Sequence, residues 1–346
     1  MKLTPGTNEN ASEKDIHTSP SGVQRWGFGS WQLWVGVLFS LGFVWLALHD
    51  VNLKETANAL RRVNVLILSL AVASYVFSTI AKAVRWQLLL AVRKSPSFGR
   101  AFSVMSVGMM MNSFLPARLG DFTRAYLMGE TEADSKVYVL GTIAVEKVVD
   151  MLFLLLSLMV LISQMALPEW LAGSARGLAL VLVILVPCFV LLAWQRDFIL
   201  RVVERTTRFV PVAWREWVVR QTSYGLASLD IVRRPRLLVG LIFWSLVIWI
   251  VSAFTNYLVF LALELVLPFW ASLLLLVVLQ VGLAILTLSI FAVNKDVALG
   301  YSIILYLVVY GPLVLIGGFC LWREKITWQK LDEALAILNR LGSKPR

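Results

Sequence analysis

Long apolar stretches separated by short polar runs dominate this chain. A helix needs about 20 apolar residues to cross a hydrocarbon core about 30 Å thick, and most of these stretches approach that length. The apolar stretches are Trp31–Leu48, Val65–Leu90, Ala101–Leu115, Val137–Ala166, Leu178–Trp194, Leu237–Leu265, Ala271–Val293 and Val297–Leu321. The pattern predicts an all-α polytopic membrane protein with about six to eight transmembrane helices.

The composition strengthens this prediction, because 59% of the 346 residues are hydrophobic, against about 45–50% in a soluble domain. The polar remainder divides the chain. Residues 1–28 mix both charges with Pro, Gly and Ser, which is typical of a disordered tail. Residues 29–322 form the predicted membrane domain, and residues 323–346 form a basic tail. One helical face of that tail carries Leu331, Leu335, Leu338 and Leu341, which predicts an amphipathic surface helix.

The connection formed by residues 195–236 sets the expected orientation. It carries nine arginines and four acidic residues, so the positive-inside rule places it in the cytoplasm. Phe198, Val202 and Phe209 recur there at helical spacing, which predicts an amphipathic helix on the inner leaflet. We expect both termini to be cytoplasmic. The net charge of +11 then indicates contact with anionic lipid, and we expect no binding to nucleic acid.

Simple alternation of eight crossings conflicts with this orientation, because it would place Arg93, Lys94, Arg100 and the basic C-terminal tail outside. Both conflicts vanish if the third and seventh stretches are re-entrant hairpins that enter and leave on one side. The chain is then two halves of opposite orientation, the inverted-repeat arrangement of many secondary transporters. This arrangement still places three basic residues on the outer side of the membrane, contrary to the positive-inside rule: Lys54, Arg61 and Arg62.

A polar run from Asn112 to Arg124 follows the third apolar stretch. Pro116 interrupts a helix there, and Gly120 permits a turn. Arg118 and Arg124 flank Asp121, and the arginine fork is suited to phosphate. Each ionisable group costs at least about 2.5–3.5 kcal/mol at the centre of a membrane helix. A charged run at this depth therefore indicates a binding site.

The fourth stretch carries further charges. Glu146 and Asp150 are four residues apart and share one helical face, with Lys147 beside them. The simplest arrangement places Arg85 and the two arginines of the polar run opposite the acidic residues, across a polar cavity. An anionic headgroup could bind to the arginines and leave, because the acids can pair with them again. The predicted headgroup site consists of Arg85, Arg118, Asp121, Arg124, Glu146, Lys147 and Asp150, with Pro116 and Gly120 as structural residues.

A purely structural role is the main alternative, since buried ion pairs can lock a helical bundle in one arrangement. Glu146 and Asp150 could also hold a metal ion. However, the chain has only two histidines and two cysteines, without the spacing of a metal site. It also lacks a P-loop and a nucleophile elbow. We therefore expect no enzyme activity, no metal and no cofactor.

Two stretches, residues 115–124 and Glu146–Asp150, resemble the flippase-like integral membrane family related to the transmembrane flippase half of lysylphosphatidylglycerol synthases. That family shows P-x-R-x-G-E-x-x-R and then E-R-x-x-D, after an Arg-Trp pair that Arg85-Trp86 matches. Asp121 stands here in place of Glu, and Lys147 in place of Arg. The resemblance covers most of the hydrophobic chain.

The second half departs further from the family pattern. The family's loop reads like P-x-x-P-G-G-x-G-x-x-E, whereas residues 288–296 contain neither Pro nor Gly. Only Ser289 and Asp296 echo the pattern. With Asn294 and Lys295, they form the weaker second-half candidate set.

The resemblance implies that residues 29–322 are a membrane transport domain. The implied function is a lipid flippase or scramblase of the inner (plasma) membrane. Its partners would be membrane lipids, either an anionic or aminoacylated phospholipid or a polyprenyl-phosphate-linked lipid. The alternative is a non-transporting scaffold that assists a lipid or glycan synthase. Assembly into an oligomer is compatible with the sequence.

Overall fold

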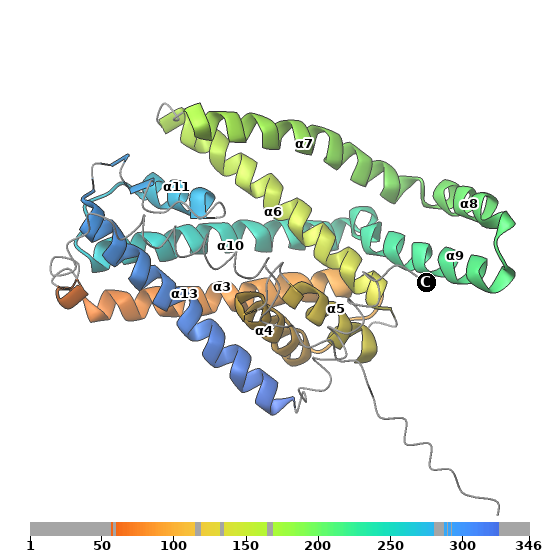
Figure 1. Ribbon diagram of the computed structural model, residues 1–346, viewed down its shortest axis with the longest axis horizontal. Coiled ribbons are helices and arrows are strands. Elements are labelled where there is room, and N and C mark those ends of the chain that lie inside the picture. The colour runs from red at the N-terminus through yellow and green to blue at the C-terminus, as the bar shows by residue number, and fades with distance from the viewer. Residues whose placement is uncertain are drawn as a thin grey trace, which may run out of the picture. The chain divides into compact units, whose positions relative to one another are not determined.

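The computed structural model describes residues 57, 60–114, 119–131, 135–164, 169–279, 287–288, 290–291 and 293–324. The chain divides into two compact units, residues 1–51 and 52–346, and all the described residues lie in the second. These residues form helices and contain no strand (Figure 1). The predictions for the two tails lie outside the described residues, apart from the final helical turn at Arg323.

The described helices follow the apolar stretches closely. They are α3 (Val65–Leu90), α4 (Phe98–Phe114), α5 (Leu119–Thr131), α6 (Lys136–Gln164), α7 (Glu169–Trp194), α8 (Arg196–Thr206), α9 (Val212–Ala227), α10 (Pro235–Ala262), α11 (Phe269–Leu279) and α13 (Lys295–Arg323), with the short 3₁₀ helices η2 (Thr207–Phe209) and η3 (Ser228–Arg233). Among the described residues, α3, α10 and α13 are long and apolar enough to cross a membrane. This architecture agrees with the predicted all-α membrane protein.

Helices α3 and α10 pack side by side in opposite directions. The backbone N–H of Asn64 donates to the carbonyl of Ala262 at 3.0 Å. Further along, the hydroxyls of Ser74 and Thr255 lie 2.9 Å apart. We call the end of the pair that holds Val65 and Ala262 the Val65 end. The opposite end, which holds Leu90 and Pro235, is the Leu90 end.

Helices α6 and α13 also run between these two ends, in opposite directions. The hydroxyl of Tyr138, in the first turn of α6, donates to the carbonyl of Leu89 at 3.0 Å, so α6 begins at the Leu90 end. Conversely, Tyr301 of α13 packs in one apolar cluster with Ala71, near the Val65 end. Cys320 of α13 packs in another cluster with Leu90. Helix α13 therefore runs from the Val65 end to the Leu90 end.

Helices α4 and α5 form a hairpin whose outer ends both lie at the Leu90 end. Arg100 near the start of α4 pairs with Glu324, which follows α13. The chain returns along α5 to Gly129, which packs against Lys136 at the start of α6. The third apolar stretch is therefore one arm of a helical hairpin inserted among α3, α6 and α13.

The segment between α10 and α13 starts and finishes at the opposite, Val65 end. Its first helix, α11, follows α10, and the rings of Trp270 and Phe291 lie 5.2 Å apart. The chain then enters α13 at Lys295. The described parts of this segment therefore leave from the Val65 end and come back to it.

Helix α7 begins earlier than the apolar pattern predicts. The apolar stretch starts at Leu178, whereas α7 starts at Glu169. The first turns contain Ser, Gly and Arg residues, which a hydropathy pattern does not distinguish from a loop but which a helix accommodates. At its other end, the carbonyl of Trp194 accepts a hydrogen bond from Arg233 at 2.9 Å, which places that end of α7 near the Leu90 end.

Candidate functional site

Three helices bring two arginines onto one carboxylate near the Leu90 end. Arg85 of α3 contacts Glu146 of α6, with Nη2 3.2 Å from Oε1. Arg124 of α5 donates from Nη2 to the other oxygen, Oε2, at 2.6 Å. All three side chains are at most 5% exposed. Glu146 therefore bridges two guanidinium groups in a place where water does not screen them.

Arg85 reaches a second carboxylate. Its Nη1 donates to Oδ1 of Asp150 at 2.6 Å, and its Nη2 lies 3.3 Å from Oδ2, which is a two-point contact. Nη1 also contacts the hydroxyl of Ser245 on α10 at 3.2 Å. Unlike Glu146, the side chain of Asp150 is 33% exposed. The ion-pair network thus has one buried acid and one acid that remains open to a ligand.

The guanidinium of Arg124 lies on an aromatic ring, which fixes its plane. Its central carbon is 4.2 Å from the ring centroid of Trp86, a cation–π geometry. The indole Nε1 of Trp86 donates to Thr142 at 3.3 Å, so the ring itself is held by α6. The two residues of the Arg-Trp pair therefore have different roles. Arg85 binds the carboxylates, and Trp86 orients Arg124.

A looser pair forms the rim of this network. Nζ of Lys147 lies 3.8 Å from Oδ2 of Asp121, and Lys147 is 38% exposed. The amide of Asn112 on α4 donates to Oδ1 of Asp121 at 3.1 Å. Asp121 therefore pairs with Lys147 and Asn112, and its described contacts do not include the arginines that the sequence led us to expect.

Two glycines let α5 approach α4 closely enough to position Arg124. A Cβ atom on Gly120 would collide with the carbonyl oxygen of Gly108 and with the backbone of Asn112. A Cβ on Gly108 would lie 2.9 Å from Cγ of Arg124. The sequence suggested a turn at Gly120, but this residue lies inside α5. Its role is close packing between helices, because only a residue without a side chain fits there.

The network leaves three buried polar atoms without a hydrogen-bond partner among the described residues. They are Nε of Arg85, Nε of Arg124 and Oδ1 of Asn112. An unpartnered buried polar group costs about 1–3 kcal/mol, so such atoms need an explanation. Two guanidinium N–H groups beside one shared carboxylate can donate hydrogen bonds to a further oxyanion, such as a phosphate or a carboxylate.

The structure brings together most, but not all, of the predicted residues. Arg85, Asp121, Arg124, Glu146, Lys147 and Asp150 lie in the network described above, while Pro116, Arg118 and Ser289 lie outside the described residues. Arg85 and Arg124 contact the acids of α6 directly, with Glu146 shared between them, and do not face these acids across a cavity. Lys82, one turn before Arg85, is close enough to interact electrostatically with Asp150.

The second-half candidates lie elsewhere. Asn294 and Lys295 are exposed and Asp296 is buried, all at the start of α13. That start packs near Ala71, which is 14 residues before Arg85 on α3. At 1.5 Å per residue, the separation along the helix is roughly 20 Å. Asp296 is therefore not a partner of the arginine network.

Sequence reasoning missed the uncharged residues that hold this network in place. Ser245 contacts Arg85, Thr142 contacts Trp86, and Gly108 makes room for Arg124. Ser245 and Thr142 are isolated hydroxyls in long apolar stretches, which is a weak signal of helix-to-helix hydrogen bonding. Among the described residues, no group of three or more His, Cys, Asp or Glu is placed to hold a metal ion.

Comparison with known proteins gives one match. A family model described as "Lysylphosphatidylglycerol synthase TM region" matches residues 33–317, a range that includes every residue of the arginine network. Neither a curated protein nor a solved structure matches the chain.

Proposed function

We propose that this chain, which belongs to the lysylphosphatidylglycerol synthase transmembrane-region family, is a flippase or scramblase that moves a lipid with an anionic or aminoacylated headgroup across the inner (plasma) membrane. Membership of this family ties the chain to lipid handling in a membrane. One observation carries the finer proposal: two buried arginines share Glu146, and each retains an unpartnered Nε donor.

The proposed chemistry is an exchange of oxyanions. A phosphate, from a phospholipid or a polyprenyl-phosphate lipid, binds Arg85 and Arg124 through their free donors and loosens their bonds to Glu146. When the headgroup leaves, Glu146 pairs with both arginines again, so the site is never left with uncompensated buried charge. No covalent step is required, and we propose no enzyme activity for the chain.

The exposed residues at the rim of the proposed site provide a second means of selecting the lipid headgroup. Asp150 is 33% exposed and Lys147 is 38% exposed, so both can meet a headgroup as it enters. Asp150 would attract the amino group of an aminoacylated or zwitterionic lipid, while the arginines hold its phosphate. An entering lipid is then bound at two points of opposite charge.

We also propose that α4–α5, and the segment between α10 and α13 to which α11 belongs, are the re-entrant parts of two inverted halves. The directions of the helices support this, because the first hairpin starts and ends at the Leu90 end and the second segment at the Val65 end. Helices α3 and α10 run in opposite directions, as do α6 and α13. Such an arrangement brings broken helices to a site within the membrane.

We propose that the Leu90 end faces the cytoplasm. Described basic residues gather there: Arg93, Lys94, Arg100, Lys136, Arg233, Arg234, Arg236 and Arg323. Under the positive-inside rule this end is cytoplasmic. Arg85 is five residues from the end of α3, about 8 Å along the helix, so the site would open toward the inner leaflet.

The second candidate function is a scaffold that assists a lipid or glycan synthase without moving lipid. One observation favours it, which is that the start of α13 contributes no residue to the arginine network. A transporter with two symmetric gates would be expected to bring charge from both halves to one place.

Lipid movement in reconstituted vesicles separates the two functions. The assay measures how fast headgroup-labelled lipids reach the outer leaflet, with anionic, aminoacylated, polyprenyl-phosphate and zwitterionic lipids in separate samples. Losing one charge-assisted hydrogen bond costs about 1.5–3 kcal/mol. We therefore expect Arg124→Gln to slow exchange of the preferred lipid at least about tenfold.

Arg62→Gln is the matched control, because Arg62 is exposed and lies at the Val65 end. It should exchange lipid at the wild-type rate. If vesicles with the wild-type protein exchange no tested lipid faster than protein-free vesicles, the proposal of lipid transport is wrong. The scaffold function is then the remaining candidate. If Arg124→Gln matches wild type, the arginine network is not the site.

A further inference from the structure

Helices α8 and α9 form a hairpin that extends beyond the Leu90 end (Figure 1), and several of its aromatic side chains are exposed. Phe209, at the bend, is 94% exposed and Trp214 is 63% exposed. The large apolar residues exposed on this hairpin are Phe198, Val202, Phe209, Val210, Val212, Trp214 and Trp217. So many exposed large apolar residues on one hairpin indicate a binding surface, because apolar side chains are costly to expose to water.

The hairpin follows α7 after a single residue. Gln195 ends α7, where its N–H donates to Leu191 at 2.8 Å, and it begins α8, where its carbonyl accepts from Ile199 at 3.0 Å; its backbone (φ −100°, ψ 28°) separates the two helices. Ile184, Leu191 and Trp194 are all exposed and recur at spacings of seven and three residues. They therefore lie along one face of α7. Phe198, in the first turn of α8, is the next exposed large apolar residue along the chain.

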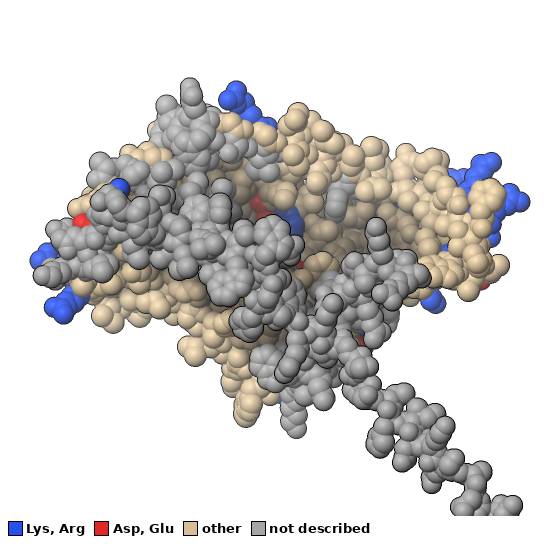
Figure 2. Space-filling model, viewed as in Figure 1, with Lys and Arg blue, Asp and Glu red and all other residues tan. Residues whose placement is uncertain are grey.

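The hairpin is also basic. Residues 196–220 contain six arginines and three acidic residues, a net charge of +3. Figure 2 shows Lys and Arg side chains projecting from the surface over α8 and α9, while most of the neighbouring surface is uncharged. Bare aromatic residues among arginines are typical of segments that bind the headgroup region of an anionic leaflet.

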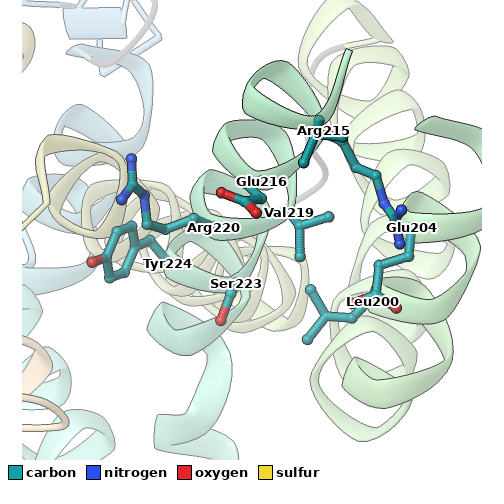
Figure 3. Close-up of a pocket in the computed structure, with 9 residues that line it drawn as sticks. Leu200, Glu204, Arg215, Glu216, Val219, Arg220, Ser223 and Tyr224 are labelled. Atoms are coloured by element: carbon teal, nitrogen blue, oxygen red, sulfur yellow. The ribbon is translucent and has the colours of Figure 1, made fainter. Parts of the chain in front are cut away.

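The space between the two helices does not explain these charges. A cavity of about 500 Å³ lies there, lined by Leu200, Glu204, Val212, Arg215, Glu216, Val219, Arg220, Ser223 and Tyr224 (Figure 3). Its lining holds two arginines and two glutamates, so it has no net charge to attract an anion. The positive charge belongs to the outer face of the hairpin.

The base of the hairpin is fixed to the helical bundle. Arg196 donates to Asp230 at 3.0 Å and to Ser223 at 3.0 Å. The guanidinium of Arg93 lies 4.6 Å from the ring centroid of Tyr224. Movement of the hairpin against a surface would therefore be transmitted to the start of α6, which packs against α9.

We propose that the α8–α9 hairpin is a peripheral arm that binds an anionic membrane surface. The surface is that of the leaflet on the side where α7 ends, which is the side of the Leu90 end. Arg205 and Arg208 contact lipid phosphates, and Phe209 and Trp214 lie at the boundary of headgroups and acyl chains. The net positive charge and the position of the hairpin directly after the apolar helix α7 favour a lipid surface over a soluble protein. This proposal is independent of lipid transport by the arginine network.

Hydrogen–deuterium exchange of the full chain in lipid nanodiscs tests the arm. The nanodiscs contain either a zwitterionic phospholipid alone or the same lipid mixed with phosphatidylglycerol. Each arginine near an anionic surface strengthens binding about fivefold. Backbone exchange in residues 198–214 should slow in the anionic nanodiscs, and high salt should remove the difference. The double variant Arg205→Gln/Arg208→Gln lacks two of these arginines. Its protection of residues 198–214 in the anionic nanodiscs should therefore be roughly twenty-five-fold weaker than that of wild type.

Two controls make the result decisive. Arg61→Gln/Arg62→Gln removes two exposed arginines at the Val65 end and should leave protection of the arm unchanged. Exchange in α5 reports lipid at the arginine network, so its response separates that site from the arm. Equal exchange of residues 198–214 in both nanodiscs overturns the proposal. So does protection that depends on an added soluble protein and not on anionic lipid.

Discussion

The two ends of helix α3 are held in the bundle by different chemistry. Toward the Val65 end, neutral hydroxyls pair across the helices, with Ser74 and Thr255 2.9 Å apart and Ser78 and Ser252 3.3 Å apart. Toward the Leu90 end, Arg85 binds two carboxylates and the hydroxyl of Ser245. Helix α3 thus makes uncharged contacts with α10 near its middle and buried ion pairs with α6 near its last turns.

This difference indicates that the ions are not needed simply to hold helices together. Interhelical hydrogen bonds between neutral groups contribute about 0.6 kcal/mol each and require little desolvation. A buried ion pair, by contrast, is often no more stabilising than an apolar replacement. Hydroxyl contacts join α3 to α10, whereas the ion pairs join α3 and α5 to α6; under the proposed function, those ion pairs serve a ligand that carries charge.

Removing the charge of Glu146 should have the largest effect. Glu146→Gln leaves Arg85 and Arg124 close together without the carboxylate that bridges them, and breaking a buried pair costs about 3–5 kcal/mol. Thermal unfolding in detergent, followed by circular dichroism, should show a large fall in Tm. Glu264→Gln, an exposed carboxylate at the Val65 end, is the control. Equal falls for both variants would show that burial of the network is irrelevant.

Filling the gap between α4 and α5 should come next. Gly120→Ala places a methyl group against the carbonyl of Gly108, and overpacking of this kind costs about 1–3 kcal/mol. We expect lower Tm and weaker lipid binding together, because the shift displaces Arg124. Gly318→Ala has open space at its Cβ and should change neither. An unchanged Tm in Gly120→Ala would mean that the close approach is not required.

The stacking of Arg124 on Trp86 should contribute a smaller amount. Arg124→Lys keeps the positive charge beside Glu146 but removes the flat guanidinium that lies on the indole. A double-mutant cycle with Trp86→Phe should give a coupling energy of about 1 kcal/mol. Strictly additive losses would indicate that the ring packs against Arg124 without orienting it.

The smallest effect should come from the neutral end. Ser78→Ala removes one hydroxyl contact with Ser252, for which we expect a loss of about 0.6 kcal/mol in thermal unfolding. Lipid exchange should not change, since Ser78 lies two turns from Arg85. A loss comparable to that of Glu146→Gln would erase the contrast between the two ends.

The fold was predictable where the length of an apolar stretch determines the length of a helix. The apolar stretch Val65–Leu90 and helix α3 have the same bounds, and the stretch Val297–Leu321 lies within α13. The re-entrant hairpins that loop charge predicts remain a proposal. The early start of α7 was not predictable, because the Gly, Ser and Arg residues within 173–177 interrupt the apolar run before Leu178.

The site was predictable as a set of residue types but not as a set of pairs. Helical spacing correctly groups Glu146 with Asp150, and both meet Arg85. Spacing says nothing about how α5 is rotated against its neighbours. In the structure Asp121 turns toward Asn112 and Lys147, while Arg124 turns inward onto Trp86. That rotation is set by the Gly108–Gly120 contact, which is visible only once the two helices are packed.

Native mass spectrometry of the protein extracted with its lipids tests the central claim most directly. We predict that wild type and the Arg62→Gln control each retain a bound anionic lipid through extraction. Arg85→Gln/Arg124→Gln should lose that lipid while remaining helical by circular dichroism. Equal retention of the anionic lipid by all three proteins would contradict the assignment of the arginine network as a headgroup site.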